Sequence, residues 1–230
     1  MRRQPYNRHP LAPAFALALA VFAGIVVALF ALDALGYAYR RIGISQGALL
    51  TVIWISLIGG FVNIPVARFR GRETIDIGEF RVFGVRYRVP VLRREPATIV
   101  AVNLGGAVIP IGLSLYLLAK DGIWWQAAIA VTFVAVVVHA FARPVRGLGI
   151  AVPALLPPLL AAGAAVLVSS TAPAAVAYVA GTLGTLIGAD LLNLSRLRDL
   201  GAGVASIGGA GTFDGVFLSG IIAVLLVGLR

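Results

Sequence analysis

The chain contains no cysteine, and among its 230 residues only nine are acidic and two are histidine. The absence of cysteine excludes disulfides and thiol chemistry. Charged residues make up 12% of the sequence, about half of what a soluble globular chain carries. The scarcity of charge therefore excludes an ordinary soluble enzyme, and it makes each acidic residue in an apolar stretch worth separate consideration.

Hydrophobic residues are abundant, at 60% of the chain with a mean hydropathy of +0.98, which identifies an integral membrane protein. Stretches of about 20 apolar residues are long enough to cross a hydrocarbon layer of about 30 Å. We predict an all-α, polytopic membrane protein, with a single transmembrane domain over residues 1–230. We interpret the first apolar stretch as a retained helix rather than a cleaved signal peptide. The seven predicted spans are 11–32, 47–66, 98–118, 123–142, 149–168, 173–193 and 212–229.

Basic residues are unevenly distributed between the two sets of loops. With the N-terminus in the cytoplasm, fifteen of the nineteen basic residues fall on the cytoplasmic side, and Arg40, Arg41, Lys120 and Arg230 fall outside. Positive residues favour cytoplasmic loops, so we expect a multi-pass plasma-membrane protein with its C-terminus outside. Trp124 and Trp125 lie at the predicted outer boundary. The net charge of +10 is then explained by topology, and we expect the lipid bilayer as a partner and no nucleic acid.

Residues 73–95 alternate apolar and polar side chains, a period of two that predicts strands. Gly78 and Gly84 mark turns, and Pro90 suits a strand end. We expect a cytoplasmic β-hairpin insertion over residues 72–94, or two short hairpins, between the second and third spans. It serves either as a basic lid facing lipid headgroups or as a template that pairs with an extended peptide. The sequence favours the first role.

Asp190 and Asp214 are the two carboxylates that lie within predicted spans. Counted from the ends of their spans, both lie a few ångströms below the cytoplasmic surface. Two carboxylates in one wet cleft share a proton, because both cannot ionise easily. The ionised carboxylate then activates water while the protonated one polarises a carbonyl, as in aspartic peptide-bond hydrolysis. The alternative is structural: Asp214 caps the last helix, and Asp190 pairs with Arg196 or Arg198.

Asn63 and Asn103 lie at the same predicted level, and we consider them candidates for binding a substrate backbone or orienting water. Each alone is better explained by an interhelical hydrogen bond. The glycines at 208, 209 and 211 let the backbone unwind beside Asp214. We do not include His139 among the candidate site residues, because we interpret it as an interfacial residue. No metal or phosphate-loop pattern is visible, and we expect no cofactor.

The segment "TFDGVFLSG" resembles the second aspartate motif of the GxGD intramembrane aspartyl proteases, the presenilin and signal-peptide-peptidase group, through Gly211, Asp214, Val216 and Phe217. That group also has a Pro-Ala-Leu motif, which resembles Pro153, Ala154 and Leu155 in "VPALLPP". The resemblance implies catalysis by Asp190 and Asp214, and substrate binding by residues 153–155, Gly209 and Gly211. Three features depart from it: Phe213 replaces a glycine, Ala189 replaces a tyrosine, and the Pro-Ala-Leu precedes the aspartates.

The chain as a whole resembles a family of prokaryotic integral membrane proteins classed as domain of unknown function 1614, which implies no activity. The resemblance is carried by "FVNIPV", "AVNLGGAVIP", "GIAVPALLPP" and "GGAGTFDGVFL". Three functions therefore stay open: an intramembrane aspartic endopeptidase that cleaves a membrane-embedded peptide, a proton- or ion-coupled transporter of small solutes, and a non-catalytic membrane scaffold. Broken helices with carboxylates fit a transporter as well as a hydrolase.

Overall fold

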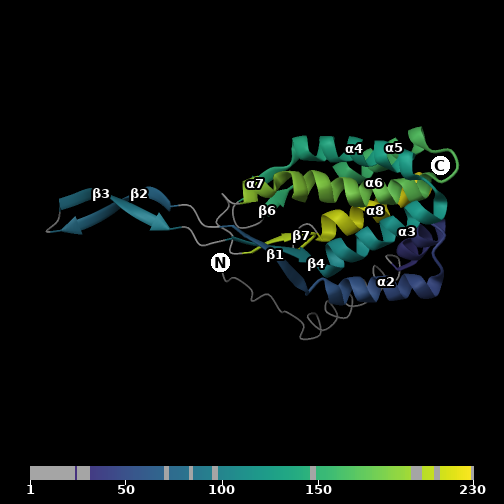
Figure 1. The fold of residues 1–230 in the computed structure, drawn as a ribbon, viewed down its shortest axis with the longest axis horizontal. Coiled ribbons are helices and arrows are strands. Elements are labelled where there is room, and N and C mark those ends of the chain that lie inside the picture. Colours follow the sequence, from purple (N-terminus) through teal and green to yellow (C-terminus); the bar gives the residue numbers. More distant parts are fainter. Residues whose placement is uncertain are drawn as a thin grey trace, which may run out of the picture.

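The protein is described by a computed structural model. It describes Gly24 and residues 32–69, 73–82, 85–94, 98–145, 149–197, 204–209 and 213–228. Within these ranges the fold is mostly helical, with a small sheet at one end of the helices (Figure 1).

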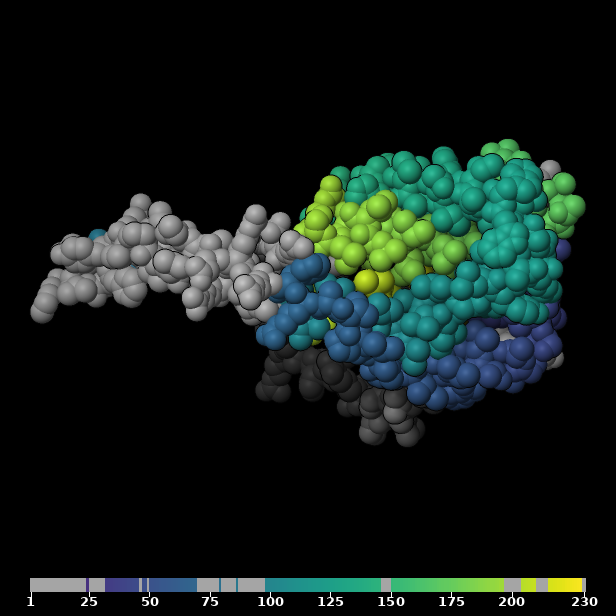
Figure 2. All heavy atoms as spheres, in the orientation of Figure 1, coloured from purple at the N-terminus to yellow at the C-terminus, as the bar shows by residue number. Residues whose placement is uncertain are grey.

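Helix α6 (Pro173–Thr185) lies at the centre of the bundle and packs against α3 (Ile109–Asp121), α4 (Trp124–Phe141), α5 (Leu156–Val168) and α8 (Phe213–Gly228). Ten of its thirteen residues are buried, whereas α4 exposes large apolar side chains such as Ile129, Phe133 and Val136. Helix α2 (Gln46–Gly59) lies along the edge of the molecule opposite α4 (Figures 1 and 2). An exposed apolar surface on helices of this kind suits contact with lipid.

Small residues let the helices around α6 approach closely. A Cβ at Gly188 would lie within 3.0 Å of the Ala135 backbone on α4, and a Cβ at Gly181 would lie 2.9 Å from the Ser219 carbonyl on α8. Glycine at these positions is therefore required by backbone-to-backbone packing, which is the usual way that helices associate in membranes.

Three strands form a sheet in the order β1-β4-β7: β1 (Asn63–Phe69), β4 (Thr98–Asn103) and β7 (Val204–Ile207). β1 pairs antiparallel with β4, with Asn63 opposite Asn103, and β4 pairs parallel with β7. Val100 and Ile207 are buried together with Leu186 and Val216, so the sheet packs on the ends of the helices that carry the two aspartates.

Two hairpins complete the described fold. β2 (Glu73–Val82) pairs antiparallel with β3 (Val85–Arg94) in a ladder that extends beyond the three-stranded sheet (Figure 1). β5 (Arg143–Val145) pairs with β6 (Gly149–Ala151) between α4 and α5. The alternating segment thus forms one hairpin rather than two, with Glu73 opposite Arg94 and Val82 opposite Val85.

Three helical segments are long and apolar enough to cross a membrane: Leu104–Asp121, Trp124–Phe141 and Pro173–Arg196. Three further apolar helices are shorter, at Leu50–Gly59, Leu156–Val168 and Gly215–Gly228. These segments identify a membrane protein. Within the first predicted span, the structure describes Gly24 and residue 32, and both are helical. The helix continues from residue 32 to residue 41, and the rest of this span lies outside the described residues.

Three predicted spans are wrong at one end, and the chain is not all-α. Residues 63–66 belong to β1 and residues 98–103 to β4, so these apolar runs form strands where helix was predicted. The fifth predicted span also begins too early, because residues 149–151 form β6 and α5 starts at Leu156.

Candidate functional site

Asp190 is the last residue of a π-helical turn, η2 (Leu186–Asp190), that continues α6. Its side chain is only 4% exposed. A π-helical turn closes hydrogen bonds from residue i to i+5, so Asp190 lies one turn from Thr185 on the same face of the helix. The Thr185 hydroxyl lies 3.2 Å from the Ser219 hydroxyl of α8, so this face is the one that meets α8. The π-helical turn thus places Asp190 five residues beyond the Thr185–Ser219 contact between α6 and α8.

A backbone amide from the chain before α8 reaches this carboxylate. The N–H of Gly208 donates to Asp190 Oδ2 over 2.8 Å in a buried hydrogen bond. Gly208 has a φ of 65°, and a Cβ there would lie 2.7 Å from the backbone of Gly106. Only glycine meets both conditions, since left-handed backbone strains other residues and no space remains for a side chain. The turn after β7 therefore holds its amide against Asp190.

Asp214 is the second residue of α8, and its side chain lies outside the described residues. Its level along the helix follows from the register of α6 and α8. Asp190 follows Thr185 by five residues and Asp214 precedes Ser219 by five, and Thr185 meets Ser219. Because the two helices are antiparallel, their backbones bring positions 190 and 214 to nearly the same level.

Asn63 and Asn103 are hydrogen-bonded to each other, with 3.1 Å between Asn103 Nδ2 and Asn63 Oδ1. Asn103 is buried, also donates to the Gly60 carbonyl over 2.7 Å, and accepts from the Gly106 N–H over 2.7 Å. Asn63 accepts in addition from the Ser206 hydroxyl of β7 over 2.5 Å. Ser206 lies two residues before Gly208, so the asparagine pair is linked to the turn that contacts Asp190.

A third asparagine, Asn193, belongs to this site and was missed by the sequence analysis. Its Nδ2 donates to the carbonyls of Gly188 over 2.9 Å and Ala189 over 3.0 Å, at the point where the π-helical turn gives way to a 3₁₀ turn. The same atom lies 3.1 Å from His139 Nδ1, and Asn193 Oδ1 accepts from Arg196 over 3.0 Å. The one signal for it in the sequence is its position, as an asparagine three residues after Asp190.

The remaining predicted site residues are distributed unevenly around Asp190. Gly209 is buried, and its N–H donates to the Ser206 carbonyl over 3.3 Å. Gly211 lies outside the described residues. Pro153, Ala154 and Leu155 form an exposed turn before α5, where the Pro153 carbonyl accepts from Leu156. This turn follows β6, whose Ile150 packs with Ala205 of β7, so it lies at the same end of the bundle as Asp190.

The arrangement joins one buried carboxylate, one fixed amide donor and three asparagines at the end of a helical bundle. Within the described ranges, no three histidine, aspartate or glutamate side chains gather as metal ligands would. Arg196, one of the partners considered for Asp190, donates to Asn193. The amide groups at this end can donate and accept hydrogen bonds, and the Asp190 carboxyl can in addition take up and release a proton.

Fold and composition define the class as a helical membrane protein with a small sheet at one end of its bundle. A family model described as "Protein of unknown function (DUF1614)" matches residues 57–226, and the chain belongs to this family. The matched range includes the sheet, Asp190 and Asp214. No curated protein matches the chain. No solved structure matches it.

Proposed function

We propose that Asp190 and Asp214 form the catalytic dyad of an intramembrane aspartic endopeptidase. The observation that carries the proposal is the register between α6 and α8, in which Thr185 meets Ser219 and the two aspartates each lie five residues beyond. Burial of Asp190 supports it further, since a catalytic carboxyl of this kind works in a protein-lined site shielded from bulk water. The resemblance of Asp214 and its neighbours to the GxGD motif agrees with this assignment.

The reaction divides two roles between the carboxyl groups. The ionised carboxylate takes a proton from a water molecule, whose oxygen attacks the peptide carbonyl while the protonated carboxyl donates to the carbonyl oxygen. The tetrahedral intermediate then collapses: the carbon–nitrogen bond breaks, the leaving nitrogen takes a proton from one carboxyl group, and a hydroxyl of the intermediate returns its proton to the other carboxylate as the C=O bond re-forms. One peptide bond and one water thus yield a carboxylic acid and an amine, and the pair again holds one proton.

Strand β7 offers a place for an extended substrate. In the described residues β7 pairs with β4 alone, and it ends one residue before Gly208, whose amide contacts Asp190. A peptide added to the other edge of β7 would be extended, which exposes the scissile bond that a helix would hide. This edge replaces the β2–β3 hairpin as the preferred template, because the hairpin ladder lies beyond the sheet (Figure 1).

We further propose seven membrane crossings with the N-terminus in the cytoplasm and the sheet on the cytoplasmic side. Arg68, Arg143 and Arg196 lie at the end of the bundle that carries the sheet, whereas Arg40, Arg41 and Lys120 line the other end. This division supports the orientation that positive residues favour. Helix α5 has 13 residues and spans only roughly 20 Å. The shorter helices would therefore complete their crossings with the irregular segments buried beside them.

The dyad is tested with Asp190→Asn and Asp214→Asn in the purified full-length protein and a fluorogenic transmembrane peptide. The amide oxygen that replaces the Asp190 carboxylate would still accept from Gly208, so the fold is expected to survive. The shared proton is lost, however, and turnover should fall at least about 10³-fold. Asp33→Asn, on an exposed helical carboxylate, is the matched control and should keep full activity.

Turnover near the wild-type rate in either variant would exclude the dyad. A wild-type protein without proteolysis that moves protons or small solutes in vesicles, and loses this in the same variants, would establish the transporter. If the wild type shows neither proteolysis nor transport and the variants unfold, the structural role is established. In that role the Gly208–Asp190 hydrogen bond only joins β7 to α6.

A further inference from the structure

A basic cavity lies at the end of the bundle opposite Asp190. Its volume is about 730 Å³. Its wall combines the end of the 32–41 helix, the junction between α3 and α4, the turn between α5 and α6, and the last residues of α8. Four segments that are distant in sequence therefore converge on a space large enough for a small ligand.

Three cations and one carboxylate line this cavity: Arg40, Arg41, Lys120 and Asp121. Arg41 is held in place, because its guanidinium donates to the Tyr37 hydroxyl over 2.9 Å and to the Gly228 carbonyl over 3.1 Å. Lys120 donates to the Ile42 carbonyl over 2.9 Å and lies 3.6 Å from Asp121. The excess positive charge favours an anionic ligand.

Space for the lysine depends on Gly43. This residue has a φ of 73°, and a Cβ there would overlap Lys120 Nζ. The Arg40 side chain is exposed and forms no hydrogen bond or ion pair with any described residue, so its guanidinium is available to a ligand. The cavity thus has two fixed cations and one that is uncommitted.

The opposite wall supplies neutral donors. Ser170 and Thr171 are exposed at the cavity, and the Ser169 hydroxyl accepts from the N–H of Ala172, the residue before α6, over 3.2 Å. Ala174 and Ala175, in the first turn of α6, also line the cavity. The amide groups at the start of a helix carry partial positive charge, so this wall adds to the attraction for an anion.

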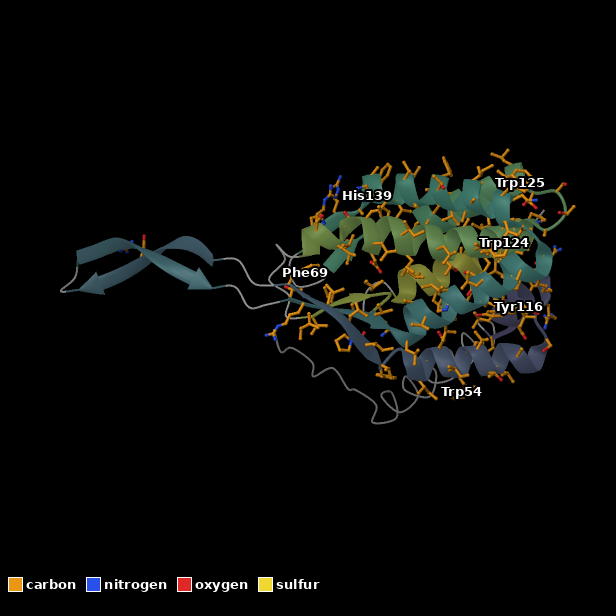
Figure 3. All side chains as sticks on the ribbon, in the orientation of Figure 1. Trp54, Phe69, Tyr116, Trp124, Trp125 and His139 are labelled. Atoms are coloured by element: carbon orange, nitrogen blue, oxygen red, sulfur yellow. The ribbon has the colours of Figure 1, made fainter. Side chains whose placement is uncertain are left out.

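The cavity also lies at the level of an aromatic belt. Trp124 and Trp125 begin α4 directly after the α3–α4 junction, and both side chains are exposed. Figure 3 shows them with Tyr116 at the end of the molecule opposite His139. Such rings prefer the depth of lipid headgroups. We propose that the cavity binds a phosphate group through Arg40, Arg41 and Lys120, presented by an anionic lipid headgroup or as a free phosphate.

The proposal is tested by thermal unfolding of the full-length protein in phosphate-free detergent micelles. One arm adds inorganic phosphate, another adds phosphatidylglycerol, and a third adds diacylglycerol, which lacks the phosphate. A ligand that binds the folded state raises Tm with its concentration. Arg40→Gln should raise the apparent Kd roughly fivefold, and the double variant Arg40→Gln with Lys120→Gln should raise it about 25-fold.

The matched control removes two exposed arginines from the other end of the bundle, Arg68→Gln with Arg143→Gln, and should change the Kd less than about twofold. A response to phosphatidylglycerol alone assigns the site to lipid, and a response to inorganic phosphate as well assigns it to the phosphate group itself. The proposal is overturned if neither ligand raises Tm, or if the control variant loses as much affinity as the cavity variants. Arg40→Gln keeps the test valid if the double variant does not fold, because the Arg40 side chain makes no hydrogen bond or ion pair with the described residues.

Discussion

At the scale of single residues, the two hydrogen-bonded asparagines of the sheet use their side-chain amides in different ways. Asn63 uses its side-chain oxygen, which accepts from Asn103 and Ser206. Asn103 uses both ends of its amide, since Nδ2 donates to Gly60 and Asn63 and Oδ1 accepts from Gly106. Asn63 is exposed and Asn103 is buried, so the two positions also differ in how they would tolerate a charge.

This difference predicts unequal effects of the same substitution. Asn103→Asp removes two donors and turns a buried carboxylate toward the Gly60 carbonyl, so it should lower the free energy of unfolding by roughly 2–4 kcal/mol. Asn63→Asp keeps the accepting oxygen and adds its charge at the surface, so the change should stay within about 1 kcal/mol. Denaturant unfolding in mixed micelles measures both, and equal losses would show that the hydrogen-bond directions are wrong.

The asparagine pair could be predicted as candidate site residues from the sequence, whereas its hydrogen-bond partners could not. Asn63 and Asn103 are short-range signals near the ends of apolar runs, and counting from those ends gives them a common level. Ser206, Asn193 and the Gly208 amide became part of the site through the parallel pairing of β4 with β7 and through the π-helical turn. A backbone donor and a change of helix type leave no pattern in side-chain hydrophobicity.

At the scale of elements, the contact between α6 and α8 sets the relative position of the two aspartates. Gly220 of α8 packs on α6, where an added Cβ would overlap Thr182 Oγ1 and lie 3.1 Å from the Tyr178 ring. Both Thr182 and Tyr178 are buried. Relief of such an overlap requires α8 to move away from α6, because neither side chain has free space.

Gly220→Ala should therefore reduce stability by roughly 1–3 kcal/mol and reduce any dyad-dependent turnover more than substrate binding. The control is Gly163→Ala on α5, where an added Cβ meets nothing within 4 Å. Alanine favours helix over glycine, so this control should leave stability unchanged or raise it by up to about 1 kcal/mol. Thermal unfolding of both variants in one detergent provides the comparison, and an equal response would argue against close α6–α8 packing.

The sequence predicted the helices better than the strands beside them. Apolar runs at 61–66 and 98–103 continue the hydropathy of neighbouring helices, and a short apolar run does not distinguish a buried strand from a helix. β-Branched residues make up half or more of each run, as in Ile64 and Val66 or Thr98 and Ile99. Strand pairing decided the outcome, because β1, β4 and β7 come from distant parts of the chain and satisfy one another's backbone groups.

At the scale of the whole molecule, the two ends of the bundle are different. One end combines the sheet, the asparagines and Asp190 with irregular backbone, and the other carries the basic cavity between short turns. Hydropathy counting suggested seven spans, but only three described helices reach the required length. The difference arises because the ends of several apolar stretches form strands or turns, which shortens the helices without making their sequences less apolar.

The orientation of this asymmetric bundle is open to a direct measurement, because the chain has no natural cysteine to remove. We predict that Ser170→Cys, exposed at the basic cavity, reacts in intact cells with a membrane-impermeant maleimide. Ala67→Cys, exposed on β1, should react only after the cells are permeabilised. The physical reason is that arginines gather around the sheet, and translocating them is costlier than retaining them in the cytoplasm. Labelling of Ala67→Cys from outside would reverse the orientation and place Asp190 near the external face, whereas labelling of both in intact cells would mean that the helices do not separate two compartments.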